Sequence, residues 1–139
     1  MNAVDTNVYL YAIDADEPAK QAQAIALFDR LVLQPSETVL IWQVAAEFLS
    51  QLRRWESKGK LTAEEVQTTF HRFNALFPLR LPIEGVFRLA FDLHSHFALS
   101  HWESMLLAAC KAAGVTTLYS EDMDSGTDYR GLRTINPFL

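Results

Sequence analysis

The sequence predicts an α/β protein with a parallel, doubly wound sheet and helices on both of its faces. Short apolar runs typical of buried strands alternate with longer segments in which apolar residues recur at helical spacing. Acidic residues follow several of these runs, as they do at the ligand-binding edge of open α/β sheets. Half of the 139 residues are hydrophobic, which is enough for one buried core. We therefore expect a single domain over residues 1–139.

The first apolar run ends abruptly in a carboxylate. We expect a strand over Ala3–Asp5 and then a short helix over Val8–Ile13, which Thr6 or Asn7 caps. A second helix opens at a proline, whose missing N–H does no harm in the first turn, and runs over Pro18–Leu33.

The next segments indicate one strand followed by two helices. Val39–Trp42 is a continuous apolar run, as in a strand that is buried on both faces. A helix over Gln43–Ser57 follows, with its apolar residues at helical spacing. The next helix begins at Thr62, which forms a capping box with Glu65, and ends before Pro78. Because no strand separates these two helices, we expect a projecting helical hairpin.

The second half of the chain returns to alternation. The predicted elements are a strand at Leu79–Ile83, helices at Val86–His96 and Ser100–Ala113, and strands at Val115–Tyr119 and Leu132–Ile135. With the two earlier strands, this makes a central, mostly parallel sheet of five strands.

Composition narrows the function. The formal net charge of −5 means that the chain does not attract nucleic acid by bulk charge, so binding would need metal cations or a local basic patch. The single cysteine, Cys110, excludes an internal disulfide and lies in a helical apolar register, which indicates a buried thiol. The N-terminus lacks a signal-peptide pattern and no apolar run approaches the length of a membrane span. We expect a cytoplasmic protein.

Four acidic residues are predicted to meet at the carboxyl-end edge of the sheet. Asp5 and Asp122 follow strands, while Glu47 and Glu103 lie in the first turns of helices. Four like charges at one edge repel one another unless a cation lies among them. Ligation by oxygen alone favours Mg²⁺ or Mn²⁺, and such a site can activate water for the displacement of a phosphodiester.

Each of these four residues also has a simpler interpretation. Asp5 suits the N-cap of the helix that follows it. Glu47 suits a solvated carboxylate near a helix N-terminus. Glu103 lies three residues after Ser100, the spacing of a capping box. Asp122 suits an acidic turn. From the residues alone, both interpretations stay open at each position.

The ordered set of motifs resembles the PIN-domain ribonucleases across essentially the whole chain. The segments that carry the resemblance are Val4–Val8, Trp42–Phe48, Ser100–Ser104 and Leu118–Gly126. The ending Ile135–Phe138 is similar to the VapC toxins of bacterial toxin–antitoxin pairs.

The resemblance implies a PIN-like three-layer α/β/α fold and a Mg²⁺- or Mn²⁺-dependent endoribonuclease, in which an activated water attacks phosphorus and leaves a 5′-phosphate and a 3′-hydroxyl. The family's first, second and fourth acidic positions map to Asp5, Glu47 and Asp122. The third is usually Asp, and here it is Glu103, whose longer side chain would reach a metal directly or through water. Two carboxylates of the same loop are alternative ligands, Glu121 and Asp124.

Further residues are candidates for contact with the substrate. Thr6 and Asn7 directly follow the first acidic position, and Ser120 matches a polar position of the family beside the fourth. Arg53 and Arg54 lie about two turns beyond Glu47 and would contact RNA phosphates, although an arginine pair of this kind also suits a solvated helix face.

Two other functions compete with the endoribonuclease. A phosphatase of the haloacid-dehalogenase type also begins with an Asp at a strand end, but it needs a second Asp two residues later, and this chain has Asn7 there. A non-catalytic PIN-like domain that binds RNA or protein is compatible with the unusual Glu103.

The resemblance also implies partners, namely an RNA substrate and a cognate antitoxin protein. The chain has nine Phe and three Trp, and three of the phenylalanines lie near one helix and its end, at Phe70, Phe73 and Phe77. If the core does not cover them all, the exposed aromatic residues mark an interface. We therefore expect a homodimer, and an antitoxin peptide that binds along a hydrophobic groove between helices.

Overall fold

Short parallel strands lie at the centre of the protein, which is described over residues 1–139 by a computed structural model. One sheet has the order β1-β4-β5, with β1 at Asn2–Val4, β4 at Thr117–Tyr119 and β5 at Arg133–Ile135. A second sheet pairs β2 (Leu40–Ile41) with β3 (Leu79–Arg80). All the pairings are parallel, as predicted. The expected single sheet of five strands is not confirmed, because only the isolated bridge between Asn2 and Thr38 links the two sheets.

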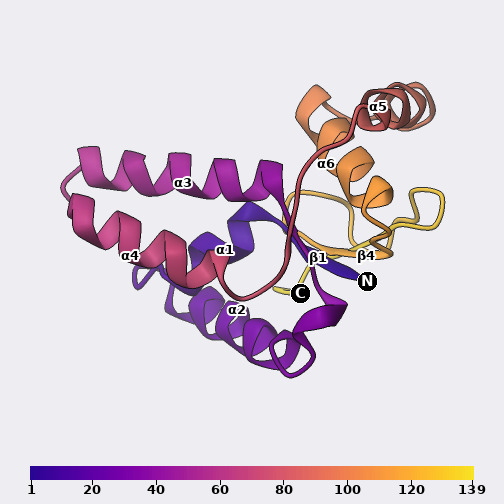
Figure 1. Ribbon diagram of the computed structural model, residues 1–139. Coiled ribbons are helices and arrows are strands. Elements are labelled where there is room, and N and C mark those ends of the chain that lie inside the picture. Colours follow the sequence, from indigo (N-terminus) through magenta and orange to yellow (C-terminus); the bar gives the residue numbers. More distant parts are fainter.

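Helices surround these strands. Their bounds are α1 Thr6–Ala12, α2 Pro18–Leu31, α3 Trp42–Ser57, α4 Ala63–Asn74, α5 Gly85–His96 and α6 His101–Ala112, with a short 3-10 helix η1 at Pro35–Glu37. In Figure 1, α6 lies above β1 and β4, and α2 lies below them. The helices pack in consecutive pairs, α1 on α2, α3 on α4 and α5 on α6. The α3–α4 pair extends away from the strands as the predicted helical hairpin (Figure 1).

The local signals for helix starts are mostly confirmed. Thr62 and Glu65 form the predicted capping box of α4, with both hydrogen bonds present. For α1, the interpretation of Asp5 as the N-cap is confirmed, and the alternative cap by Thr6 or Asn7 is wrong, because these two residues are already helical. Their side chains are therefore free to reach other elements.

Four of the five predicted strands were too long. Trp42 begins α3 instead of ending β2, and its side chain is 49% exposed. β3 ends at Arg80, and the residues that follow it, Leu81 and Ile83, are exposed. The run at Val39–Trp42 does contain a buried strand, since Val39, Leu40 and Ile41 are buried. At its end, and in the run after β3, tertiary packing leaves apolar residues on the surface.

Aromatic residues form much of the core between the helices. Tyr9 packs on Phe28 with ring centroids 4.8 Å apart, and Phe48 packs on Phe73 at 5.7 Å. Phe73 and Phe77 are buried and Phe70 is half-buried, but the core does not cover every aromatic residue. Those left exposed are Trp42, Phe87, Phe91 and Trp102. Burying a phenylalanine in this way is worth about 3–5 kcal/mol against alanine.

Two of the expectations from composition are also settled by the structure. Cys110 is a free, fully buried thiol, as predicted, and its burial raises the pKa of the thiol. None of the helices has the length and apolar character needed to cross a membrane.

Candidate active site

Asp5 lies where β1 ends, and it is almost completely buried. The parallel register places Val4 opposite Tyr119, and the Asp5 N–H donates to the carbonyl of Tyr119 at 2.9 Å. The side chain is 6% exposed, and both of its oxygens accept hydrogen bonds. Oδ1 accepts from the Thr6 N–H and Oδ2 from the Ser120 hydroxyl, each at 2.7 Å. Asp5 is therefore a helix cap as well as the central carboxylate of this edge.

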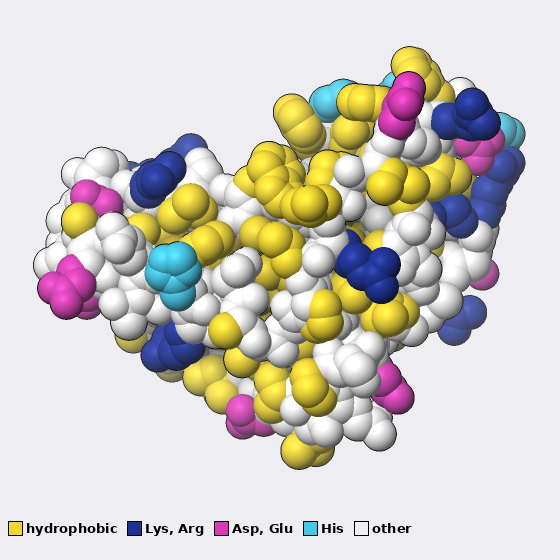
Figure 2. Space-filling view, viewed as in Figure 1, with side chains coloured by type: hydrophobic (Ala, Val, Ile, Leu, Met, Phe, Trp, Pro, Cys, Tyr) yellow, Lys and Arg dark blue, Asp and Glu magenta, His cyan; other side chains and the backbone are white.

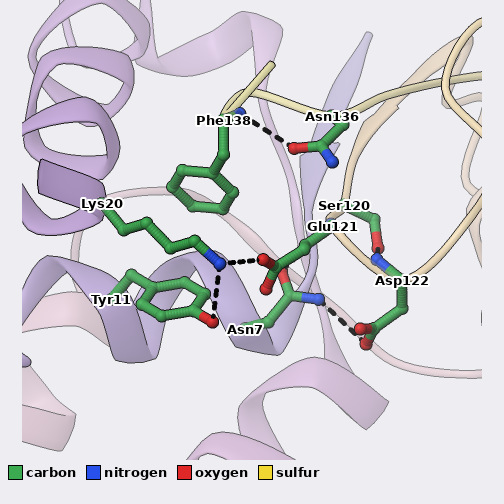
Figure 3. A network of polar contacts seen from close by, with 8 residues as sticks. All are labelled: Asn7, Tyr11, Lys20, Ser120, Glu121, Asp122, Asn136 and Phe138. Atoms are coloured by element: carbon green, nitrogen blue, oxygen red, sulfur yellow. Dashed lines mark hydrogen bonds and ion pairs between the residues drawn. The ribbon is translucent and has the colours of Figure 1, made fainter. Parts of the chain in front are cut away.

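Two other predicted carboxylates are tied to the first turn of α1. The Thr6 hydroxyl donates to Oε2 of Glu47 on α3 at 3.1 Å. The Asn7 amide donates to Oδ2 of Asp122 at 2.9 Å, an interaction that Figure 3 shows. The two helical residues that directly follow Asp5 therefore each hold one of the other acidic side chains.

These side chains surround one polar cavity of about 280 Å³. Its lining residues are Asp5, Thr6, Asn7, Leu10, Glu47, Ser50, Gln51 and Asp122. A larger, mostly apolar groove of about 440 Å³ lies elsewhere, between the start of α3, the segment before α5, and α6. We place the candidate site in the smaller cavity, because the acidic side chains converge there.

The chemistry of Asp5 differs from that of an ordinary aspartate. Burial raises its pKa from 3.8 to about 6, and the negative charges of Asp122 and Glu47 act in the same direction. The hydrogen bonds from Ser120 and Thr6 lower the pKa but do not offset burial. Such a carboxyl group exchanges a proton near neutral pH, which suits an acid or base.

Glu103 lies apart from the other three carboxylates. Its Oε1 accepts a hydrogen bond from the Ser100 N–H at 2.8 Å, and the Ser100 hydroxyl accepts from the Glu103 N–H at 3.2 Å. The capping box of α6 is thus present in full. Glu103 does not line the cavity, and its charge acts on Tyr129 and not on Asp5.

The predicted substrate-binding residues occupy different positions. Ser120 is fully buried, and its hydroxyl donates a hydrogen bond to Asp5. Thr6 and Asn7 line the cavity while they hold carboxylates. Arg53 and Arg54 are exposed on α3 and lie outside the lining of the cavity.

Two residues that support the site were not predicted from the sequence. Gln43 donates to Oε1 of Glu47 at 3.0 Å and lies near the Trp102 carbonyl at 3.4 Å, so it links α3 to the start of α6. Its spacing of four residues before Glu47 was a usable signal. Lys20 pairs with Glu121, 101 residues away, and no local pattern indicates this contact.

Comparison with known proteins supports the fold. No protein-family model matches the chain, and no curated protein matches it. Among solved structures, the chain is similar to VapC20 of Mycobacterium tuberculosis, described as a sarcin-ricin loop cleaving toxin, with a TM-score of 0.61. The likeness covers 89% of this chain and 92% of that chain at 15% sequence identity.

The chain has the PIN-like fold of a VapC toxin. The resemblance inferred from the motifs is thereby confirmed for the fold. At 15% identity the comparison concerns the fold, and the activity has to be argued from the residues of this chain.

Proposed function

We propose that this protein is a divalent-metal-dependent endoribonuclease and the toxin of a toxin–antitoxin pair. The observation that carries the proposal is the convergence of Asp5, Glu47 and Asp122 on one cavity at the carboxyl ends of the strands. The shared fold with a toxin that cleaves the sarcin-ricin loop supports the choice of RNA as the substrate.

The side chains of the cavity have the donor chemistry for Mg²⁺ or Mn²⁺. Apart from Leu10, they carry carboxylate, hydroxyl or amide groups, with no sulfur and no imidazole. No three acidic, His or Cys side chains are arranged to hold a metal by themselves. Mg²⁺ does not require this, because it is usually held by one or two carboxylates together with water and substrate phosphates. We therefore propose Asp5 and Asp122 as the main ligands, with Glu47 beside them.

The carboxylates also have a role in proton transfer. When bound, a divalent cation supplies positive charge that stabilises the negative charge developing on the phosphate. One carboxylate of the cavity accepts the proton of the attacking water. The water oxygen forms a bond to phosphorus, the bond to the 3′-oxygen breaks, and this oxygen takes up a proton. The products are a 5′-phosphate and a 3′-hydroxyl.

Cleavage of a defined RNA panel by the purified protein tests this function. The panel includes a sarcin-ricin loop oligonucleotide, because the structurally similar toxin acts on that loop. We expect cleavage with Mg²⁺ or Mn²⁺, none in excess EDTA, and recovery when the metal is restored. Asp122→Asn is expected to lower the rate at least about a hundredfold, on the scale of a lost electrostatic contact in a transition state.

Asp29→Asn is the matched control for Asp122→Asn. Asp29 is an exposed aspartate on α2 whose side chain makes no hydrogen bond or ion pair in the chain. The Asp29→Asn variant should cleave RNA like the wild type. Undiminished cleavage in excess EDTA, or by Asp122→Asn, would contradict the proposed chemistry.

A homodimer through the apolar groove is part of the proposal. Figure 2 shows hydrophobic side chains gathered around α5, α6 and the chain that leads into α5. Large exposed members of this surface are Trp42, Leu81, Ile83, Phe87 and Trp102, and all of them line the groove. Arg80 and Glu84 also line it and form no ion pair within the chain. The groove therefore carries one unpaired charge of each sign beside its apolar residues, which is what a self-complementary twofold interface needs.

The cognate antitoxin is proposed from the toxin fold alone. Co-expression with a small protein encoded beside this one should abolish cleavage and yield a stable complex. A non-catalytic domain that binds RNA is the second candidate, and the position of Glu103 in its capping box, outside the cavity, favours it. Tight RNA binding without cleavage at any metal concentration would support that alternative.

A further inference from the structure

The ammonium group of Lys20 lies between three parts of the chain. Lys20 belongs to the first turn of α2, and its Nζ pairs with Oε1 of Glu121 in the loop after β4. The same Nζ donates to the Tyr11 hydroxyl of α1 at 3.2 Å and lies 4.7 Å from the centre of the Tyr11 ring. Phe138, near the C-terminus, lies on its other side at 5.6 Å (Figure 3). One cation thus joins α1, α2, the β4 loop and the C-terminal segment.

Glu121 stands between two residues of the candidate site. Ser120 holds Asp5, and Asp122 accepts from the Asn7 amide. The Glu121 N–H itself approaches the Asn7 side-chain oxygen at 3.4 Å. Each of residues 120–122 is therefore attached to α1 or to its N-cap, Asp5, and a shift of Glu121 would move Asp122.

The side chain of Glu121 points away from the acidic cavity. The chain bends at residues 121–123, and the Asp122 N–H donates to the Ser120 hydroxyl at 3.2 Å. Accordingly, Asp122 lines the cavity and Glu121 does not, and Figure 3 shows Glu121 directed at Lys20. A free carboxylate next to Asp5 and Asp122 would add repulsion to an already acidic site. Lys20 neutralises the Glu121 carboxylate and holds it outside the acidic cavity.

The pair differs from an ordinary surface ion pair. The side chains of Lys20 and Glu121 are 34% and 26% exposed, and Lys20 also has a hydroxyl and two aromatic rings around it. The pair Lys60–Asp16, by contrast, spans 3.5 Å with side chains 49% and 80% exposed. Isolated surface ion pairs add little stability. The informative test of the Lys20–Glu121 pair is therefore its effect on the position of Asp122.

We propose that Lys20 is a positioning residue that fixes Asp122 at the candidate site by holding Glu121 on α1 and α2. This inference rests on the proposed nuclease function for its catalytic consequence. The positional part stands on the contacts of Lys20 with Glu121, Tyr11 and Phe138.

The test uses two variants that change the net charge in opposite directions. Lys20→Met removes a positive charge, and Glu121→Gln removes a negative one. If the pair positions Asp122, both variants lower kcat about three- to tenfold with little change in KM, as expected for a small misplacement. If Lys20 only attracts RNA by its charge, the two variants shift KM in opposite directions and leave kcat unchanged, which overturns the proposal.

A readout that does not depend on activity accompanies these assays. Amide hydrogen exchange at residues 121 and 122 should become at least about fivefold faster in both variants, because the loop opens locally. Lys20→Arg should restore kcat and protection, since arginine keeps the charge and the donors. Lys60→Met is the matched control and should change neither quantity.

The outcomes separate the two proposals. A wild-type protein that does not cleave RNA refutes the nuclease function, while faster exchange in Lys20→Met still supports the positioning role. Wild-type exchange at residues 121 and 122 in both variants overturns the positioning role, whatever the activity. If Lys20→Met does not fold, Glu121→Gln, which keeps the shape of the side chain, decides the question alone.

Discussion

The buried Ser120 hydroxyl donates a 2.7 Å hydrogen bond to Oδ2 of Asp5, the carboxylate whose pKa burial raises to about 6. This hydrogen bond favours the charged form of Asp5 and so lowers its pKa. A neighbour that is 115 residues away in the sequence therefore limits the effect of burial on the first residue of the site.

Ser120→Ala is expected to raise the pKa of Asp5 further above 6, because the stabilising donor is lost and burial is unchanged. The measurement is a carboxyl titration by NMR on the metal-free protein, with wild type as reference. Ser57→Ala is a suitable control, since the Ser57 hydroxyl bonds only to the Arg54 carbonyl on the exposed end of α3. An Asp5 pKa that stays at 6 or falls would show that the hydrogen bond has no such role.

The stability of the metal-free protein should depend on the ionisation of Asp5. Its pKa is higher in the folded chain than in the unfolded chain, so the folded state binds more protons between the two values. The contribution of Asp5 to the free energy of unfolding is full below about pH 4. It is lost as pH rises through about 6, a loss on the order of 2–3 kcal/mol. The Asp5→Asn variant should lack this pH-dependent part of the unfolding free energy.

Urea unfolding in EDTA at pH 4, 5, 6 and 7 measures the dependence in wild type and Asp5→Asn. The two proteins are compared by how their unfolding free energy changes with pH. A hydrogen bond that Asp5→Asn loses at every pH does not affect this change. Parallel profiles for the two proteins would rule out a raised Asp5 pKa.

Glu103→Gln separates charge from capping at that position. Gln also accepts the hydrogen bond from the Ser100 N–H, so the expected loss of stability is under about 1 kcal/mol, the scale of a helix cap. If Glu103 contributes its charge to the metal site, as the resemblance to PIN-domain ribonucleases implies, cleavage by this variant is at least about tenfold slower, or about 1.4 kcal/mol of barrier, and needs more metal. Glu103→Asp should keep substantial activity.

A fully active Glu103→Gln, together with a merely less stable Glu103→Ala, would assign Glu103 to the cap alone. The site would then have three carboxylates. The capping box in the structure makes this outcome a direct alternative.

Ile83→Asp is expected to turn a dimer into a monomer. Ile83 is 62% exposed and lines the apolar groove that we assign to a second copy, where a buried unpaired charge opposes association. Sedimentation at tens of micromolar measures the state. Leu33→Asp is the matched control, because Leu33 is 79% exposed at the end of α2 and away from the groove. A monomeric wild type would contradict the dimer.

Replacing Arg53 and Arg54 by alanine tests whether α3 contacts RNA phosphates. If it does, KM rises several-fold, kcat changes little and the dependence of binding on salt becomes shallower, since fewer counterions are released. Filter binding at several salt concentrations measures the effect. An unchanged salt dependence would identify the pair as a solvated helix face.

Local features of this protein were readable in the sequence because they depend on neighbours a few residues apart. The capping boxes of Thr62 with Glu65 and of Ser100 with Glu103 follow from a three-residue spacing. The position of Asp5 at a strand end follows from an apolar run that stops at a carboxylate. The parallel α/β fold follows from the alternation of such runs with amphipathic segments.

Only the tertiary structure decided which of these side chains meet. It brought Asp5, Glu47 and Asp122 to one cavity and left Glu103 in its cap. It gave Lys20 a partner 101 residues away. The physical reason is that capping is a contact within one helical turn, whereas a shared cavity depends on how separate helices pack on the strands, and no short-range pattern encodes that packing.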